Sequence, residues 1–115
     1  MPTLAEFGKS YAERIADALR QDGFTRYATI NESVVRSSRT ARVLRDIQRE
    51  IDGLVITETR EKLSASDRAA IWRTVATELT LPDAVLMEKA AMAASNDDLT
   101  DLVDTIDNIL KGRGK

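Results

Sequence analysis

Arginine recurs at three- and four-residue intervals through one stretch of the chain. The segment from 26 to 49 holds six arginines against two acidic residues, Glu32 and Asp46. On a helix this spacing places side chains along one face, where guanidinium groups can bind phosphates or carboxylates. The candidate residues for binding a partner or a nucleic acid are Arg36, Arg39, Arg42, Arg45 and Arg49.

The same arginines also fit the solvated face of an ordinary helix. Glu32 stands four residues before Arg36, and Asp46 lies within four residues of both Arg42 and Arg49, which are the spacings of helical ion pairs. The net charge of −2 disfavours a dedicated nucleic-acid binder, because such domains are usually basic. A solvated or partner-facing surface is therefore favoured, with phosphate binding as the alternative. The two arginines left without a local partner are Arg39 and Arg45.

Acidic residues gather at the other end of the chain. The segment from 83 to 110 carries seven of them against one basic residue, Lys89. On a final amphipathic helix the aspartates would lie away from the leucines and isoleucines and face water. An acidic face of this kind could also meet the arginine side of a second copy or of a basic partner.

A metal-dependent reaction is a further hypothesis for these acids. The stretch 97–101 reads D-D-x-x-D, and Glu58 and Glu61 could face Asp98 and Asp101 from a neighbouring helix. Carboxylates so arranged suit Mg²⁺ on a phosphorylated substrate, as in a magnesium-dependent all-α phosphohydrolase. The chain has no cysteine and no histidine, which excludes thiolate catalysis and removes the commonest general base. We predict no cofactor and no catalytic set, and hence a non-enzymatic protein.

One predicted helix is apolar on all sides. The segment "PDAVLMEKAAMAAS", residues 82–95, carries only three charged residues, so the helix must be buried. Burial could be complete within one chain, or it could be finished in an oligomer or a partner's groove. The candidate interface residues are Val85, Leu86, Met87 and Met92.

Capping residues delimit the first helices that would carry these side chains. Thr3 with Glu6 forms a capping box, and the apolar repeat that follows continues to Gly23. Thr29 with Glu32 forms a second box. It would open one long helix over about 30–62, kinked or broken near Gly53, since glycine readily ends a helix.

Three more helices follow. Ser64 with Asp67 predicts the start of one, Pro82 suits the first position of the next, and Ser95 with Asp98 suits the start of the last. The sequence therefore predicts an all-α fold, a small bundle of about five helices that forms a single domain over 1–115.

These observations favour a soluble, cytoplasmic interaction protein. No stretch approaches the roughly 18 apolar residues of a membrane span, and the first 20 residues are too charged for a signal peptide. We predict a non-enzymatic helical interaction or regulatory module, a homodimer, whose partner is another protein or a second copy of itself. A nucleic-acid-associated protein is the alternative, and the magnesium-dependent phosphohydrolase is the third hypothesis.

Overall fold

Helices account for most of the chain. The structure, a computed structural model, describes residues 3–56, 58–95 and 99–113, without the side chains of Asp101 and Arg113. The prediction of an all-α bundle is confirmed. In these ranges the helices are α1 (Leu4–Gln21), a short 3-10 helix η1 (Tyr27–Thr29), α2 (Glu32–Val35), α3 (Arg39–Gly53), α4 (Ala65–Glu78), α5 (Leu81–Ala94) and α6 (Thr100–Arg113).

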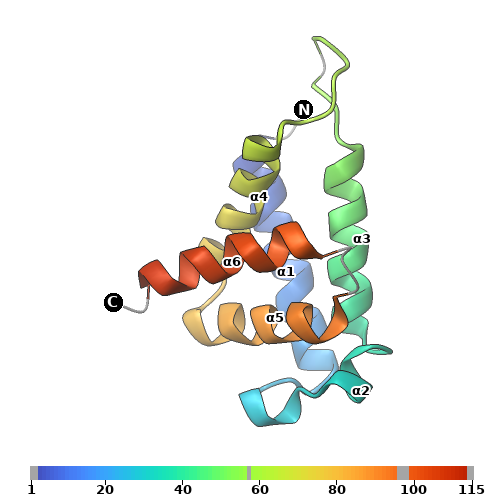
Figure 1. The fold of residues 1–115 in the computed structure, drawn as a ribbon, viewed down its shortest axis with the longest axis vertical. Helices are drawn as coiled ribbons and strands as arrows, with labels where there is room; N and C mark the ends of the chain where they lie inside the picture. The colour runs from blue at the N-terminus through green and yellow to red at the C-terminus, as the bar shows by residue number, and fades with distance from the viewer. Residues whose placement is uncertain (1–2, 57, 96–98, 114–115) are drawn as a thin grey trace.

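Two groups of helices pack across each other. α1 contacts both α3 and α4, while α5 and α6 lie next to one another and cross that group (Figure 1). Apolar stripes hold the groups together, because each helix can bury its apolar side only against its neighbours. The core includes Ile15 of α1, Leu44 of α3, Trp72 of α4 and Met87 of α5, all fully buried.

The predicted long helix over 30–62 is wrong. Thr29 does not cap it, because its hydroxyl donates to the carbonyl of Arg26. Asn31 accepts from the N–H of Val34 at 3.1 Å and begins the one-turn α2. Ser38 then accepts from the N–H of Ala41 at 3.1 Å and begins α3. Two side chains that can each cap a helix thus divide this segment into two helices.

The described residues between α3 and α4, 54–56 and 58–64, are not helical. Leu54 is extended, and Val55 pairs with Lys62 in an isolated antiparallel bridge, so the helix breaks at Gly53 rather than kinking. Val55 and Ile56 are β-branched and favour extended backbone, which explains the break. The resulting loop projects from one end of the bundle (Figure 1).

The predicted starts of α1 and α4 are confirmed, whereas those of the last two helices differ from the prediction. Thr3 accepts from the N–H of Glu6 and Ser64 from that of Asp67, each at 3.1 Å. The helix containing Pro82 begins one residue earlier than expected, because Thr80 caps it by accepting from Asp83. The prediction that Ser95 starts the last helix is wrong, because Ser95 ends α5 and α6 begins at Thr100; Asp98 lies outside the described residues.

A short series of side-chain hydrogen bonds links α3 to α4. The indole N–H of Trp72 donates to the side-chain oxygen of Gln48 at 3.1 Å, and the amide nitrogen of Gln48 donates to Asp52 at 2.9 Å. These bonds satisfy the polar atoms of two buried side chains, as a well-packed core requires. None of the described helices is both long and apolar enough to cross a membrane.

Candidate functional site: an arginine surface on α3

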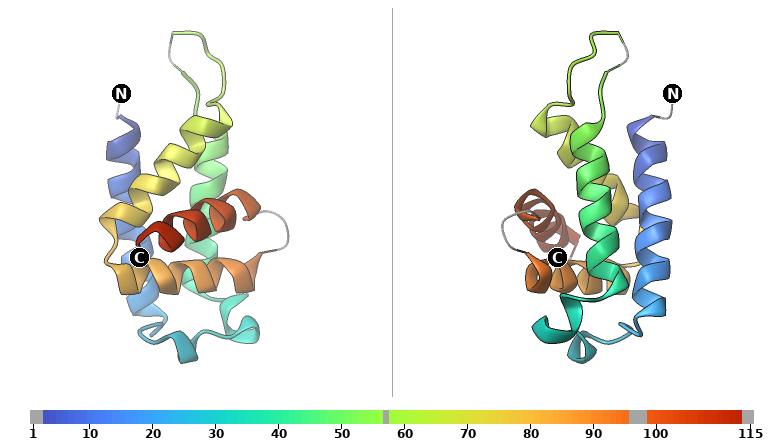
Figure 2. Two further views of the ribbon diagram at one scale, coloured as in Figure 1. Left: turned by 60° about the vertical axis from the view of Figure 1, so that its left-hand side comes forward. Right: turned by 90° about the vertical axis from the view of Figure 1, so that its right-hand side faces the viewer.

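The arginine series lies where α2 turns into α3 and then along α3. Arg36 follows α2 directly, and the other four lie on α3, whose start is fixed by the Ser38 cap. α3 runs beside α1 at the edge of the bundle (Figure 2, right). Arg42 and Arg49 are exposed, whereas Arg45 is half-buried.

Two hollows adjoin on this side of the molecule. The first, which we call the arginine hollow, has a volume of about 190 Å³ and is lined by Arg36, Ser37, Ser38, Arg42, Arg45, Asp46 and Arg49. The second, the α1–α3 groove, has a volume of about 310 Å³ and is lined by Arg14, Asp17, Ala18, Gln21, Arg39, Arg42 and Val43. Arg42 lines both. The structure therefore brings all five predicted arginines, and Arg14 in addition, to one surface.

Most of these arginines already have partners within the chain. Arg36 pairs with Glu32, as expected, and Arg49 lies 3.6 Å from Asp46. The two arginines that were expected to lack a local partner have partners elsewhere in the fold. Nη1 of Arg39 donates to the side-chain oxygen of Gln21 at 2.6 Å, and Nη2 of Arg45 donates to the carbonyl of Ala94 at 2.7 Å. Both contacts come from helices distant in sequence.

Arg42 is the exception. Its guanidinium makes no hydrogen bond or ion pair with any residue in the described ranges, and Asp46, its expected partner, lies against Arg49 instead. An exposed guanidinium with no internal partner keeps all its donors available for an incoming oxyanion. Arg42 is therefore the most available arginine of the surface.

Asp22 positions this surface, and the sequence pattern did not single it out. Its carboxylate accepts hydrogen bonds from the N–H groups of Arg39 at 3.1 Å and Thr40 at 2.6 Å, and from the Thr40 hydroxyl at 2.6 Å. A carboxylate at a helix N-terminus satisfies free N–H groups and faces the positive end of the helix dipole. The end of α1 is thereby fixed to the start of α3.

The predicted interface residues on α5 do not form one surface. Leu86 and Met87 are buried in the core of the single chain, and Val85 is half-buried. Only Met92 is largely exposed, at 59%. The apolar helix is therefore buried by the chain's own α1, α3 and α6, and Leu86 and Met87 are not available to a partner.

The acids proposed for magnesium are not arranged as expected. Glu58 and Glu61 lie exposed on the loop between α3 and α4 instead of on a helix, so the predicted helical spacing is wrong. Asp98 and the side chain of Asp101 lie outside the described residues. Among the residues described there is no group of three acidic, histidine or cysteine side chains that could hold a metal ion.

Glu88 on α5 is a titratable group that the sequence did not mark. One of its carboxylate oxygens is buried without a hydrogen-bond partner in the described structure. Burial raises the pKa of Glu88, Asp107 on α6 raises it further, and Lys111 partly lowers it. Lys111 is itself bound to Asp107 at 2.7 Å. Glu88 therefore lies at the α5–α6 contact, where its ionised form is disfavoured relative to its protonated form.

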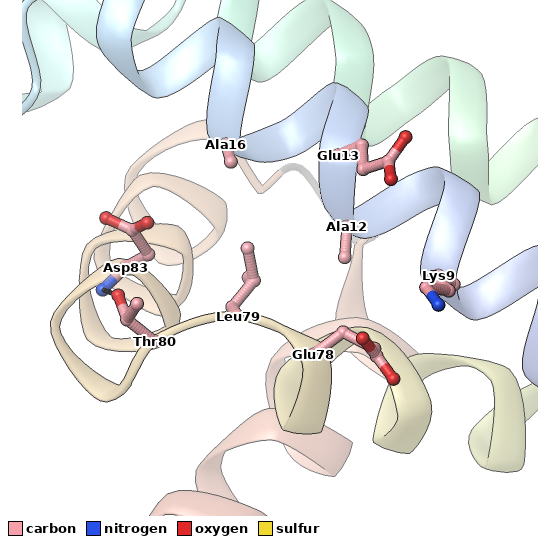
Figure 3. Close-up of a pocket in the computed structure, with 8 residues that line it drawn as sticks. All are labelled: Lys9, Ala12, Glu13, Ala16, Glu78, Leu79, Thr80 and Asp83. Carbon is pink, nitrogen blue, oxygen red and sulfur yellow. Dashed lines mark hydrogen bonds between the residues drawn. The ribbon is translucent and has the colours of Figure 1, made fainter.

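A third hollow lies where α1 meets the turn between α4 and α5. It has a volume of about 290 Å³, and Leu79 points toward Ala12 and Ala16 of α1 (Figure 3). Its polar lining has both charge signs and no unpartnered buried atom that would indicate a ligand. The remaining lining residues are Lys9, Glu13, Glu78, Thr80 and Asp83.

Comparison with protein-family models, with curated proteins and with solved structures gave no match to this chain.

Proposed function

We propose that this protein is a non-enzymatic interaction module of the cytoplasm that binds another protein, or a second copy of itself, through the arginine surface of α3. The observation that carries the proposal is the pair of adjoining hollows that share Arg42. Concave surfaces lined by arginine are suited to partners, because the planar guanidinium binds carboxylates with two parallel hydrogen bonds.

Affinity purification of the tagged full chain from its native lysate, with and without nuclease, tests this proposal. Three forms are compared: wild type, Arg42→Glu, and Arg73→Glu as a control, since Arg73 is exposed on α4 outside both hollows. We expect a stoichiometric protein that survives nuclease and is lost only with Arg42→Glu. A partner retained equally by all three forms would show that the arginine surface is not the binding site.

Self-association is measured separately. Sedimentation equilibrium of the wild type and of Arg42→Glu shows whether a second copy is the partner, since a dimer formed through this surface would dissociate in the variant. A concentration-independent monomer leaves another protein as the partner.

Nucleic-acid association is the second candidate, because six arginines and only two acids lie between 26 and 49. Its signature is binding to an oligonucleotide that weakens steeply with salt, since each phosphate contact releases counterions. Co-purified material that is lost on nuclease treatment would favour this candidate over the first.

A further inference from the structure

The surface around Arg42 combines charge with an apolar floor. In the α1–α3 groove, Ala18 is buried and Val43 is half-buried, while Arg14, Arg39 and Arg42 surround them. A groove between two neighbouring helices accepts the ridge of a third helix. An amphipathic helix bound there would pack small apolar residues against Ala18 and Val43 and would pair its acidic residues with the arginines.

The arginines repeat with the period of a helix. Arg39 and Arg42, which both line the α1–α3 groove, stand at positions i and i+3 of α3, so they lie on one face and about 4.5 Å apart along its axis. A second helix lying alongside has the same rise per residue. Carboxylates three or four residues apart on one face of that helix would therefore come into register with these two arginines.

Acidic residues interleaved among the arginines argue for a protein rather than a nucleic acid. Asp17 lines the α1–α3 groove, and Asp46 lines the arginine hollow. A nucleic-acid backbone carries negative charge at every unit and would be repelled by both carboxylates. A protein helix can place its carboxylates opposite Arg42 and keep neutral residues opposite the two aspartates.

From these observations we infer that the occupant of the α1–α3 groove is an acidic amphipathic helix of a partner protein, which places a carboxylate on Arg42. This inference rests on the proposed function and names the partner's chemistry. Arg42 is the first contact, because it is exposed and keeps all its donors available.

The test uses the full chain and three fluorescent probes. The first is a helical peptide whose glutamates stand at positions i, i+3 and i+7, so that they share one face, with alanines at the positions beside them. The second has the same composition with the glutamates spread around the helix, and the third is a single-stranded oligonucleotide of equal charge. Affinities are measured by fluorescence anisotropy for wild type, Arg42→Glu and the control Arg73→Glu.

We expect the one-faced peptide to bind at least about fivefold more tightly than the scrambled one, with about a tenfold loss in Arg42→Glu and less than about a twofold change in Arg73→Glu. Equal affinity for the two peptides, or an unchanged affinity in Arg42→Glu, overturns the inference. Tighter, Arg42-dependent binding of the oligonucleotide overturns it in favour of a nucleic acid.

A photo-crosslinker at Gln21, an exposed residue of the α1–α3 groove, separates this inference from the proposed function. If a purified native partner binds through Arg42 but is crosslinked at a segment that is neither acidic nor helical, the interaction module stands and the acidic helix is wrong. If no protein binds and neither peptide does, both proposals fall.

Discussion

Asp22 connects two helices that are separated by two short ones in sequence. Its carboxylate accepts three hydrogen bonds from the first residues of α3 while its own residue ends α1. Replacing it with alanine leaves two helix N–H groups without their partner. We expect Asp22→Ala to lower the free energy of unfolding by about 2–3 kcal/mol, as measured by urea denaturation.

Asp17 provides the matched control for that substitution. It is exposed, and among the described residues its side chain pairs only with Arg20, three residues further along α1. We expect Asp17→Ala to change the free energy of unfolding by less than about 0.5 kcal/mol. Equal losses in the two variants would mean that Asp22 stabilises α3 no more than an ordinary surface charge does.

Glu88 gives the stability a defined pH dependence. Burial and Asp107 raise its folded-state pKa above the ordinary value of 4.5. The folded state then holds the proton more tightly than the unfolded state, so this group's contribution to stability falls as the pH rises through the window between the two values. Glu88→Gln removes the ionisation. We expect it to flatten this dependence and to raise the stability near neutral pH.

Urea denaturation at about pH 5 and pH 7 measures this effect. Glu78→Gln, on the exposed side of α4, is the control. It should leave unchanged the difference in the free energy of unfolding between about pH 5 and pH 7. A Glu88→Gln variant that is less stable than wild type at neutral pH would contradict the prediction, because it would mean that the ionised carboxylate is favourable in the fold.

At the scale of the elements, α1 and α4 approach closely at Gly8. A Cβ at this position would lie 2.6 Å from both Cβ and Cγ2 of Thr74 and 3.1 Å from the carbonyl oxygen of Ile71. Alanine is the better helix former by about 1 kcal/mol, but overlap with a β-branched side chain and a backbone atom outweighs that gain. We expect Gly8→Ala to lower the free energy of unfolding by about 1–3 kcal/mol in urea.

Gly112 on α6 is the control for this substitution. A Cβ there would meet no heavy atom within 4 Å, and the residue is helical. We expect Gly112→Ala to be neutral or to stabilise the protein by up to about 1 kcal/mol. If Gly8→Ala behaved in the same way, α1 and α4 would have room to move apart at their contact.

The sequence predicts a helix start correctly where the capping side chain lies close in sequence to the N–H group that it binds. Thr3 and Ser64 were identified correctly because a hydroxyl and the N–H three residues later are enough to define a helix start. The break at Ser38 was missed because Ile30, Val34 and Ala41 recur at helical spacing across it, and two of them, Ile30 and Ala41, are buried. Periodicity alone does not distinguish one long helix from two that share a buried side.

The candidate surface was only partly predictable for the same reason. The spacing of the arginines follows from the sequence, and all five do reach one side of the molecule. The hydrogen-bond partners of these arginines cannot be predicted from the sequence. Gln21 and Ala94 reach Arg39 and Arg45 only through the packing of helices that are distant in sequence. Asp22 could have been suspected only from the general rule that a helix start needs acceptors.

For the whole molecule, the buried residues form one continuous core. It includes residues from α1, α3, α4, α5 and α6, with Trp72 fully buried as the single tryptophan. A single core predicts cooperative unfolding. We expect the urea midpoints from Trp72 fluorescence and from far-ultraviolet circular dichroism to coincide; separate midpoints would show that some helices melt independently of the core.

The loop between α3 and α4 has a practical consequence. Its two arms meet at the Val55–Lys62 bridge, so the chain leaves and re-enters the bundle at nearly the same point. A cut or an insertion beyond that bridge would leave every helix intact, as exposed loop tips generally allow. We expect a chain divided there, into a half carrying α1 to α3 and a half carrying α4 to α6, to reassemble through the extensive contact of α1 with α4. Such halves, fused to two other proteins, would form a complementation reporter.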